Sequence, residues 1–153
     1  MRSIRIAFAA ALIMGLFMGT ILPGQASAQA KRTITVATDA TWPPMEMVDA
    51  NKNIVGFDID FLKAVAKEAG FKVVFKNTAW DGIFAGIEAG KYDAIISSVT
   101  ITDERKKTMD FSDPYINAGQ ILVVPKTDKT SKVLADLQGK KAGAQIGTTG
   151  AME

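Results

Sequence analysis

Hydroxyl side chains and an arginine are grouped in one short stretch of the chain. Residues 97–102 (SSVTIT) follow a short apolar run and precede Arg105. If Thr102 caps a helix, the backbone N–H groups here point toward an anion, and Arg105 lies in a first turn whose dipole disfavours a cation. A bound carboxylate would satisfy the guanidinium with two parallel hydrogen bonds. The alternative is a surface arginine paired with Asp103, Glu104 or solvent, and the spacing leaves both open.

Both tryptophans of the chain directly follow predicted strands. Trp42 precedes Pro43 and Trp80 precedes Asp81, so neither ring belongs to an apolar periodic run. Flat indole rings in such loops can enclose the carbon skeleton or the cationic head of a small ligand. Each ring could equally cover the edge of its own core.

Two more loops carry groups suited to a small zwitterion. Asp39 could accept a hydrogen bond from a ligand amide or ammonium group, or it could form a local Asx turn. Residues 147–150 (GTTG) could begin a second anion-binding helix, or form an ordinary turn. Glu46 and Glu88 show no partner in the sequence, and we expect both to be solvated.

An open α/β sheet is the scaffold that the apolar pattern predicts. We predict strands at residues 33–38, 72–76, 94–96, 120–124 and 142–146, an amphipathic helix from Phe57 closed by Gly70, a second helix capped by Asp81 and closed by Gly90, and short helices near residues 102 and 133. The loops at residues 39–42, 78–81 and 97–105 then leave the carboxyl ends of strands, where such sheets bind ligands.

Composition excludes several classes of chemistry. The chain has no cysteine and no histidine, so it holds no disulfide, no Cys/His zinc site, no catalytic cysteine and no Ser-His-Asp triad. We predict no metal, no cofactor and no catalytic residue. Of 18 basic residues, Arg2 and Arg5 lie in the leader described next, which leaves 16 basic against 16 acidic residues. A neutral chain without a basic cluster argues against a nucleic-acid partner.

The first 28 residues have the pattern of a secretory signal peptide. Arg2 and Arg5 form the positive region, residues 6–19 are apolar, and Ala26-Ser27-Ala28 supplies a small-residue cleavage site. We predict cleavage after Ala28 and export to the periplasm. The alternative is a membrane anchor, but the apolar run is shorter than the roughly 20 residues that span a bilayer.

Four blocks of the chain, in this order, resemble the polar-amino-acid periplasmic binding proteins of ABC transporters, solute-binding protein family 3. The strongest block is AIISSVTITDERKKTMDFSDPY at residues 94–115. The others are ATDATWPPME at residues 37–46, GFDIDFLKAVAKEAG at 56–70 and AWDGIFAGIEAGKYD at 79–93. The resemblance covers the whole chain after the leader.

The resemblance implies the type II periplasmic-binding-protein fold, in which two α/β lobes close on a ligand by hinge motion. We therefore predict a signal peptide at residues 1–28, a first lobe at 29–119, a hinge strand at 120–125 and an incomplete start of the second lobe at 126–153. The family also uses a second-lobe acid and a second hinge strand, which would lie after Glu153. We expect the 153-residue chain to bind amino acid poorly or not at all.

The function that the resemblance implies is capture of a free polar or basic amino acid for an inner-membrane ABC permease, by a monomer that is not an enzyme. Arg105 would grip the ligand α-carboxylate, and Asp39 would lie near the side-chain end of the pocket. The predicted ligand-binding residues are Asp39, Trp42, Trp80, Ser97, Ser98, Thr100, Arg105 and Thr149. Alternatives are an enzyme on the same scaffold, of the cyclohexadienyl or prephenate dehydratase type, and an extracellular sensory input domain.

Overall fold

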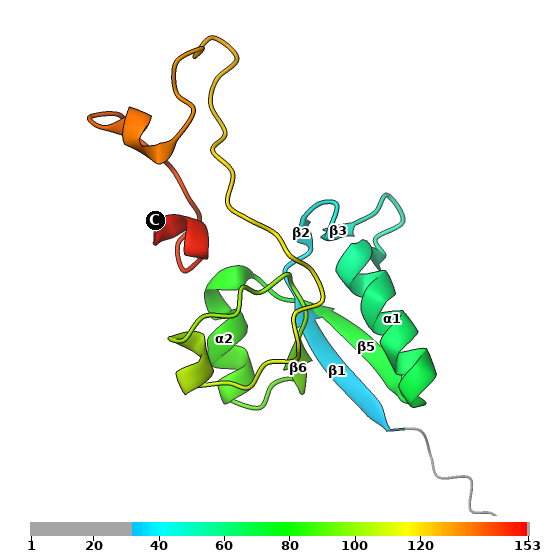
Figure 1. Cartoon of the computed structure of the whole chain (residues 1–153). Helices are drawn as coiled ribbons and strands as arrows, with labels where there is room; N and C mark the ends of the chain where they lie inside the picture. The colour runs from blue at the N-terminus through cyan, green and yellow to red at the C-terminus, as the bar shows by residue number, and fades with distance from the viewer. Residues whose placement is uncertain (1–31, 153) are drawn as a thin grey trace, which may run out of the picture. The chain divides into compact units, whose positions relative to one another are not determined.

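A three-stranded parallel sheet is the centre of the chain (Figure 1). The computed structural model describes residues 32–152, so the predicted signal peptide and its cleavage after Ala28 lie outside the described residues. Strand β1 (Thr33–Thr38) lies between β5 (Lys72–Asn77) and β6 (Ala94–Ile95). Val36 pairs with both Phe75 and Ala94, so the carboxyl ends of the strands are neighbours at one edge.

Two helices pack against this sheet. Helix α1 (Phe57–Ala69) packs on β5, and α2 (Trp80–Glu88) packs on β6. The core is built from short and aromatic side chains that the strands and α2 bring together, and it includes Ala37, Trp80, Ile83 and Tyr92. This arrangement confirms the predicted open α/β sheet with its first three strands.

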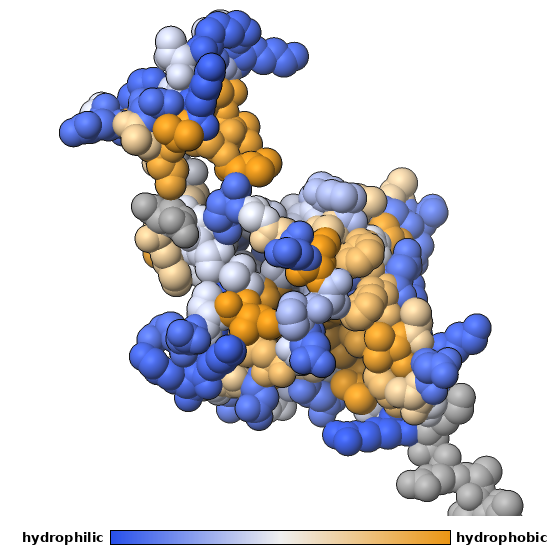
Figure 2. All heavy atoms as spheres, in the orientation of Figure 1, coloured by the Kyte–Doolittle hydropathy of each residue, from blue (hydrophilic) through white to orange (hydrophobic). Residues whose placement is uncertain are grey.

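Helix α1 begins at Phe57, and Gly70 closes it as predicted, in a left-handed conformation that returns its N–H to the Ala66 carbonyl. Its apolar stripe is only partly buried, since Phe57 and Phe61 stay exposed while Ile59 is fully buried. Apolar side chains accordingly gather on the surface over α1 (Figure 2). The ring of Tyr115 stacks on Phe61 with the centroids 4.9 Å apart.

The predicted cap of α2 is wrong by two residues. The helix begins at Trp80, so Asp81 lies inside its first turn and Ala79 is the N-cap, without a side-chain hydrogen bond. The ring of Trp80 packs edge-on against that of Phe84, one turn further along the helix, with the centroids 5.0 Å apart. This contact stabilises Trp80 as the first helical residue. Asp81 still suits its position, because the helix dipole favours an acid in the first turn.

A small antiparallel sheet follows β1, where the sequence predicts only a loop and a turn. It consists of β2 (Thr41–Trp42), β3 (Glu46–Val48) and β4 (Ile54–Val55), in that order. The Pro43–Pro44 peptide in the β2–β3 turn is cis. The turn places Glu46 in a fully buried position, which corrects the prediction that this residue is solvated.

Gly56 joins β4 to α1 in a conformation that other residues rarely adopt. Its φ is 134°, and a Cβ there would lie 2.3 Å from the Met45 carbonyl oxygen. We expect Gly56→Ala to lower the free energy of unfolding by about 2 kcal/mol or more, measured by urea denaturation of the chain without its leader. Gly82→Ala is the matched control, since its Cβ meets nothing within 4 Å and alanine favours a helix. Equal stability of the two variants would contradict the prediction.

The strands predicted at 120–124 and 142–146 are not formed, so the predicted hinge strand at 120–125 is corrected. A strand needs a neighbour for its backbone hydrogen bonds, and no strand among residues 32–152 pairs with either segment. Ile121 and Val123 are 83% and 81% exposed, as expected for unpaired chain. The predicted short helix near residue 133 is a 3₁₀ helix, Leu134–Leu137. No described helix has the length and apolar character to cross a bilayer.

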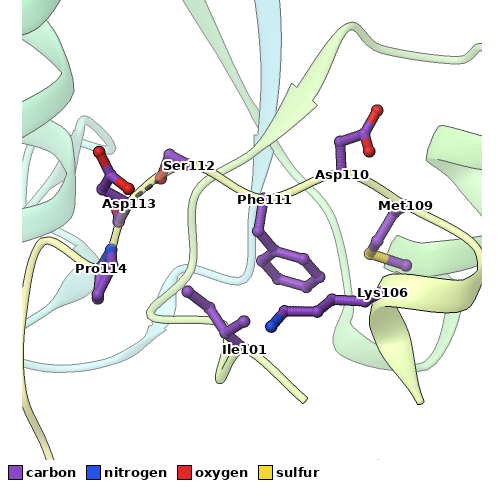
Figure 3. A pocket seen from close by; sticks show the side chains of 8 residues that line it. All are labelled: Ile101, Lys106, Met109, Asp110, Phe111, Ser112, Asp113 and Pro114. Carbon is purple, nitrogen blue, oxygen red and sulfur yellow. Dashed lines mark hydrogen bonds between the residues drawn. The ribbon is translucent and has the colours of Figure 1, made fainter. Parts of the chain in front are cut away.

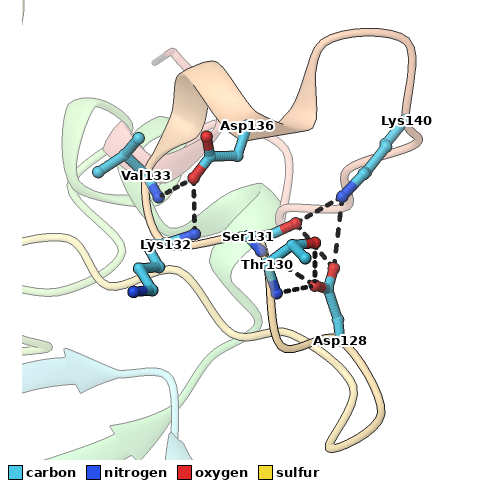
Figure 4. A network of polar contacts seen from close by, with 7 residues as sticks. All are labelled: Asp128, Thr130, Ser131, Lys132, Val133, Asp136 and Lys140. Carbon is cyan, nitrogen blue, oxygen red and sulfur yellow. Dashed lines mark hydrogen bonds and ion pairs between the residues drawn. The ribbon is translucent and has the colours of Figure 1, made fainter.

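Carboxylates give residues 126–140 their local order (Figure 4). Asp128 accepts the backbone N–H groups of Thr130 and Ser131 at 2.9 Å each, and Lys140 Nζ lies 3.4 Å from its second oxygen. Asp136 accepts two backbone N–H groups at the start of the following 3₁₀ helix. These hydrogen bonds hold the pKa of both carboxyls below its ordinary value.

Candidate functional site

Three loops meet at the carboxyl edge of the parallel sheet, as the sequence predicts. Asp39 follows β1, Thr78 follows β5, and Ser97 lies just after β6. The backbone N–H of Asp39 donates to Ser97 Oγ at 3.1 Å, and the N–H of Thr78 donates to the Thr38 carbonyl at 2.9 Å. The loops therefore contact one another directly, and they bring their polar groups into one region.

The guanidinium of Arg105 lies against aromatic rings and backbone carbonyls. It donates to the Thr100 carbonyl at 2.8 Å and to the Gly147 carbonyl at 3.0 Å. Its Cζ lies 5.6 Å from the Trp80 ring centroid and 5.0 Å from that of Phe84, within cation–π range. Partial burial lowers the pKa of Arg105 below its ordinary value.

No carboxylate within residues 32–152 forms an ion pair with Arg105. Asp103 instead pairs with Lys106 at 3.9 Å, and Glu104 pairs with Lys107. The two acids that would make Arg105 an ordinary surface ion pair are therefore taken by lysines. A half-buried guanidinium bonded only to neutral carbonyls is a favourable place for an added carboxylate.

The helix expected to carry Arg105 is a single 3₁₀ turn, Arg105–Lys107. Its N-cap is Glu104 and not Thr102 as predicted, although Thr102 Oγ1 accepts the backbone N–H of Arg105 at 3.2 Å. One turn has almost no macrodipole, so the helix-dipole argument for an anion at Arg105 does not apply here. The case for an anion rests on the contacts of the guanidinium itself.

The two tryptophans occupy different environments. Trp80 is 7% exposed and packs in the core beneath Arg105, so it covers the core and contacts the guanidinium at once. Its indole Nε1 is buried and has no hydrogen-bond partner in the part of the chain that is described. Trp42 lies on the short strand β2 and is 45% exposed.

The loop at residues 147–149 contacts the Arg105 group. Thr149 Oγ1 lies 3.2 Å from Thr100 Oγ1, and Gln120 Nε2 donates to Thr149 Oγ1 at 2.8 Å. Gly147 has a φ of 75°, which disfavours a side chain, and a Cβ there would lie in van der Waals contact with Trp80 Nε1, at 3.4 Å. The structure thus brings Thr100, Arg105 and Thr149 together. Gln120 joins them, which the sequence analysis missed; its only signal is a polar residue opening an apolar run.

Asp39 makes a local contact but not the Asx turn that the sequence left open, because the Thr41 N–H donates to the Asp39 backbone carbonyl at 2.7 Å and not to its side chain. Its Oδ1 accepts the Thr41 hydroxyl at 2.8 Å, and its residue is almost fully buried. Asn77 accepts the next backbone N–H, from Ala40, at 3.1 Å. Asp39 is therefore fixed at the start of the loop that leads to Trp42.

Ser97 and Ser98 bond to two buried acids that the sequence analysis missed. Ser97 Oγ donates to Glu46 Oε1 at 2.6 Å. The backbone N–H and the hydroxyl of Ser98 both donate to Asp58 Oδ2, at 2.6 and 3.1 Å. One signal for Asp58 exists in the sequence: it lies four residues before Leu62 and so belongs to the apolar side of α1.

Glu46 has an unusual protonation behaviour. Burial, as the largest cause, raises its pKa from 4.5 to about 8, and the charges of Asp58 and Asp39 act in the same direction, while the Ser97 hydrogen bond opposes them. Its second oxygen, Oε2, is buried without a partner in the described part of the chain. A neutral carboxyl group is therefore favoured at this position near neutral pH.

The family model for bacterial extracellular solute-binding proteins, family 3, matches residues 34–144. The chain belongs to this family. The matched range includes the parallel sheet and the Arg105 loop. The match confirms the resemblance and the predicted fold class, which is the two-lobe fold of this family.

Curated relatives of the chain are named for amino acids. The probable histidine-binding protein of Neisseria gonorrhoeae is 43% identical over 115 residues, covering 75% of this chain and 43% of that protein. ABC transporter arginine-binding protein 1 of Escherichia coli is 41% identical over 122 residues, covering 80% and 49%. The chain spans about half the length of the curated relatives it matches.

Solved structures agree. An ancestral arginine-binding protein bound to arginine is 50% identical with a TM-score of 0.76, covering 80% of this chain and 54% of that one. A point mutant of the arginine-bound form of domain 1 from TmArgBP is 46% identical with a TM-score of 0.54, covering 57% of this chain and 67% of that one. An ancestral amino acid-binding protein, a precursor of cyclohexadienyl dehydratase, is 53% identical with a TM-score of 0.54, covering 57% and 39%.

An open pocket of about 440 Å³ has neither Arg105 nor Trp80 in its lining. Phe111, the side chains around it and the turn at Asp113 and Pro114 form its wall (Figure 3). Its lining residues are Ile101, Lys106, Met109, Asp110, Phe111, Ser112, Asp113 and Pro114. None of the predicted ligand-binding residues lines it, so it is not the candidate site.

Proposed function

We propose that this chain is the ligand-capturing part of an ABC importer's periplasmic binding protein, and that its ligand is a free amino acid with a basic side chain. One observation carries the proposal: the Arg105 guanidinium lies on Trp80 with only neutral carbonyls as partners within residues 32–152. The names of the arginine- and histidine-binding relatives support a basic ligand.

The ligand α-carboxylate would accept hydrogen bonds from Arg105. It would replace the Gly147 carbonyl as partner of one guanidinium nitrogen, because a charge-assisted hydrogen bond is stronger than one to a neutral oxygen. The hydroxyls of Thr100 and Thr149, which already lie together, would add donors. The exposed ring of Trp42 and the carboxylate of Asp39 would face the cationic end of the ligand.

Ser97 and Ser98, which the sequence predicts as ligand-binding residues, would serve this site indirectly. Their hydroxyls and the Ser98 N–H are bonded to Glu46 and Asp58. They would shape the loop that carries Thr100, while the donors to the ligand come from Arg105 and the threonines.

Family membership supports the proposed setting. We infer export to the periplasm by the predicted signal peptide at residues 1–28, action as a monomer, and docking to an inner-membrane permease. The matched relatives are named as binding proteins, and the neighbour linked to a dehydratase is itself described as amino acid-binding. A binding role without catalysis is therefore favoured.

Titration of L-arginine and L-histidine into the chain without its leader tests the proposal. We expect saturable chemical-shift changes at residues 97–105 with affinity weaker than micromolar, since domain 1 of a relative is described in an arginine-bound form. L-Leucine and D-arginine are the controls, because they lack the basic side chain or the matching stereochemistry. Absence of saturable change with any of the twenty amino acids would contradict the proposal.

A further inference from the structure

One buried carboxylate accepts hydrogen bonds from two separate segments of the chain, one of which is the loop at residues 97–105. Asp58, in the first turn of α1, is fully buried. Its Oδ2 accepts the Ser98 N–H at 2.6 Å, the Ser98 hydroxyl at 3.1 Å and the Tyr115 hydroxyl at 2.9 Å. The carboxylate thus ties α1 to the segment after β6 and to the segment around residue 115.

Ser98 adopts a backbone conformation that explains why it needs this anchor. Its φ is +46°, in the left-handed region that residues with a Cβ enter at a cost in free energy. A strained conformation persists only where its surroundings fix it. The Ser98 N–H donates to Asp58 Oδ2 at 2.6 Å and also to the Tyr115 hydroxyl at 3.1 Å, and that hydroxyl itself donates to Asp58. The shorter bond, to Asp58, is the stronger contact that fixes Ser98 here.

The position of Ser98 is transmitted to the ligand site through the next two residues. The Thr100 carbonyl accepts a hydrogen bond from Arg105, and the Thr100 hydroxyl lies against that of Thr149. If Ser98 relaxed to an ordinary conformation, the following peptides would rotate and the Thr100 carbonyl would leave Arg105.

We propose that Asp58 is a positioning residue of the amino-acid site: by holding Ser98 in its left-handed conformation, it fixes the loop that presents Thr100 to Arg105. The effect of Asp58 on amino-acid binding rests on the proposed function. The effect of Asp58 on the conformation of the loop does not.

Packing alone does not account for an acid at this position. Ile59 and Ala66 supply the buried apolar contacts of α1, and an apolar residue would avoid the desolvation of a carboxylate. Burying a carboxylate is tolerated where several donors satisfy it, and Asp58 has them. The acid is therefore explained by what it holds.

The test compares Asp58→Asn with Asp60→Asn in the chain without its leader. Asp60 lies on the same helix, but it is exposed and pairs only with Lys63, at 3.9 Å. By hydrogen exchange followed with NMR, we expect the Ser98 amide to be protected in the unaltered chain and to exchange at least about 10-fold faster in Asp58→Asn. Amides of β1 should keep their protection, and Asp60→Asn should leave Ser98 unchanged.

A second substitution distinguishes a positioning role of Asp58 from a general contribution to the stability of the fold. Glycine enters the left-handed region without cost, so Ser98→Gly added to Asp58→Asn should recover part of the arginine affinity lost in Asp58→Asn. Loss of affinity without any recovery would overturn the positioning role. Should Asp58→Asn unfold the chain, the scalar coupling across the hydrogen bond between Ser98 ¹⁵N and Asp58 ¹³Cγ in the unaltered chain decides, and its absence would overturn the inference.

Failure of the proposed function has a different signature. If the unaltered chain binds no amino acid, the proposed function fails, while the Ser98 exchange rate still reports on Asp58. If Asp58→Asn and Asp60→Asn change Ser98 exchange equally, the inference fails whatever the chain binds.

Discussion

Arg105→Ala should abolish amino-acid binding, with a loss of about 2–5 kcal/mol in binding free energy, the range for removing a partner from a buried charge pair. The guanidinium has no acid partner within residues 32–152, so its charge is free to meet the ligand carboxylate. The fold should survive the change, because the core beneath the guanidinium is made by Trp80 and Ile83. Titration with L-arginine followed by NMR measures the effect.

Two further variants make the result specific. Arg105→Lys keeps the positive charge but loses the planar fork, so we expect weak residual binding. Lys106→Ala removes the neighbouring cation, which is exposed and pairs with Asp103, and it should leave binding unchanged. Saturable binding that persists in Arg105→Ala with unchanged affinity would refute the assigned role and remove the main support for the proposed function.

Regular elements with a local signal were predictable from the sequence. The four-residue apolar spacing after Phe57 and the glycine at position 70 gave α1 its observed start and end. The β-branched run at residues 33–38 gave β1. These signals are local because helix period and strand propensity belong to neighbouring residues. The three loops at the strand ends followed from the fold class.

Features that depend on distant partners were not predictable. Residues 120–124 have the apolar character of a strand, but a strand also needs a neighbouring strand to pair with, and the local sequence does not indicate whether one is present. Glu46 and Asp58 are acids, which are almost always exposed, and their burial depends on Ser97 and Ser98, about 40 to 51 residues away. The structure therefore brings the predicted loops together, and the sequence did not indicate the buried acids that hold them.

The free energy of unfolding should fall as pH rises from about 5 to 8. The reason is that Glu46 keeps its proton in the folded chain over most of this range and loses it in the unfolded chain. Its folded pKa is about 8, against 4.5 for the ordinary group. Between these values the folded chain keeps the proton and the unfolded chain has lost it. The unfolded state thus binds fewer protons, and the free energy of unfolding decreases by up to about 1.4 kcal/mol per pH unit.

Urea denaturation at several pH values between 5 and 8 measures this slope, and Glu46→Gln should remove most of it. Glu88→Gln, an exposed acid at the end of α2, should leave the slope unchanged. The groups that surround Glu46 are Asp39 after β1, Asp58 on α1, Ser97 after β6 and, through Asp58, Tyr115. A slope that Glu46→Gln does not change would mean that Glu46 is ionised in the fold, with Ser97 as its donor. Glu46 accepts the Ser97 hydroxyl and Asp58 accepts the Ser98 N–H, so the acid that keeps its proton and the acid that orders residues 97–105 hold adjacent residues of one network.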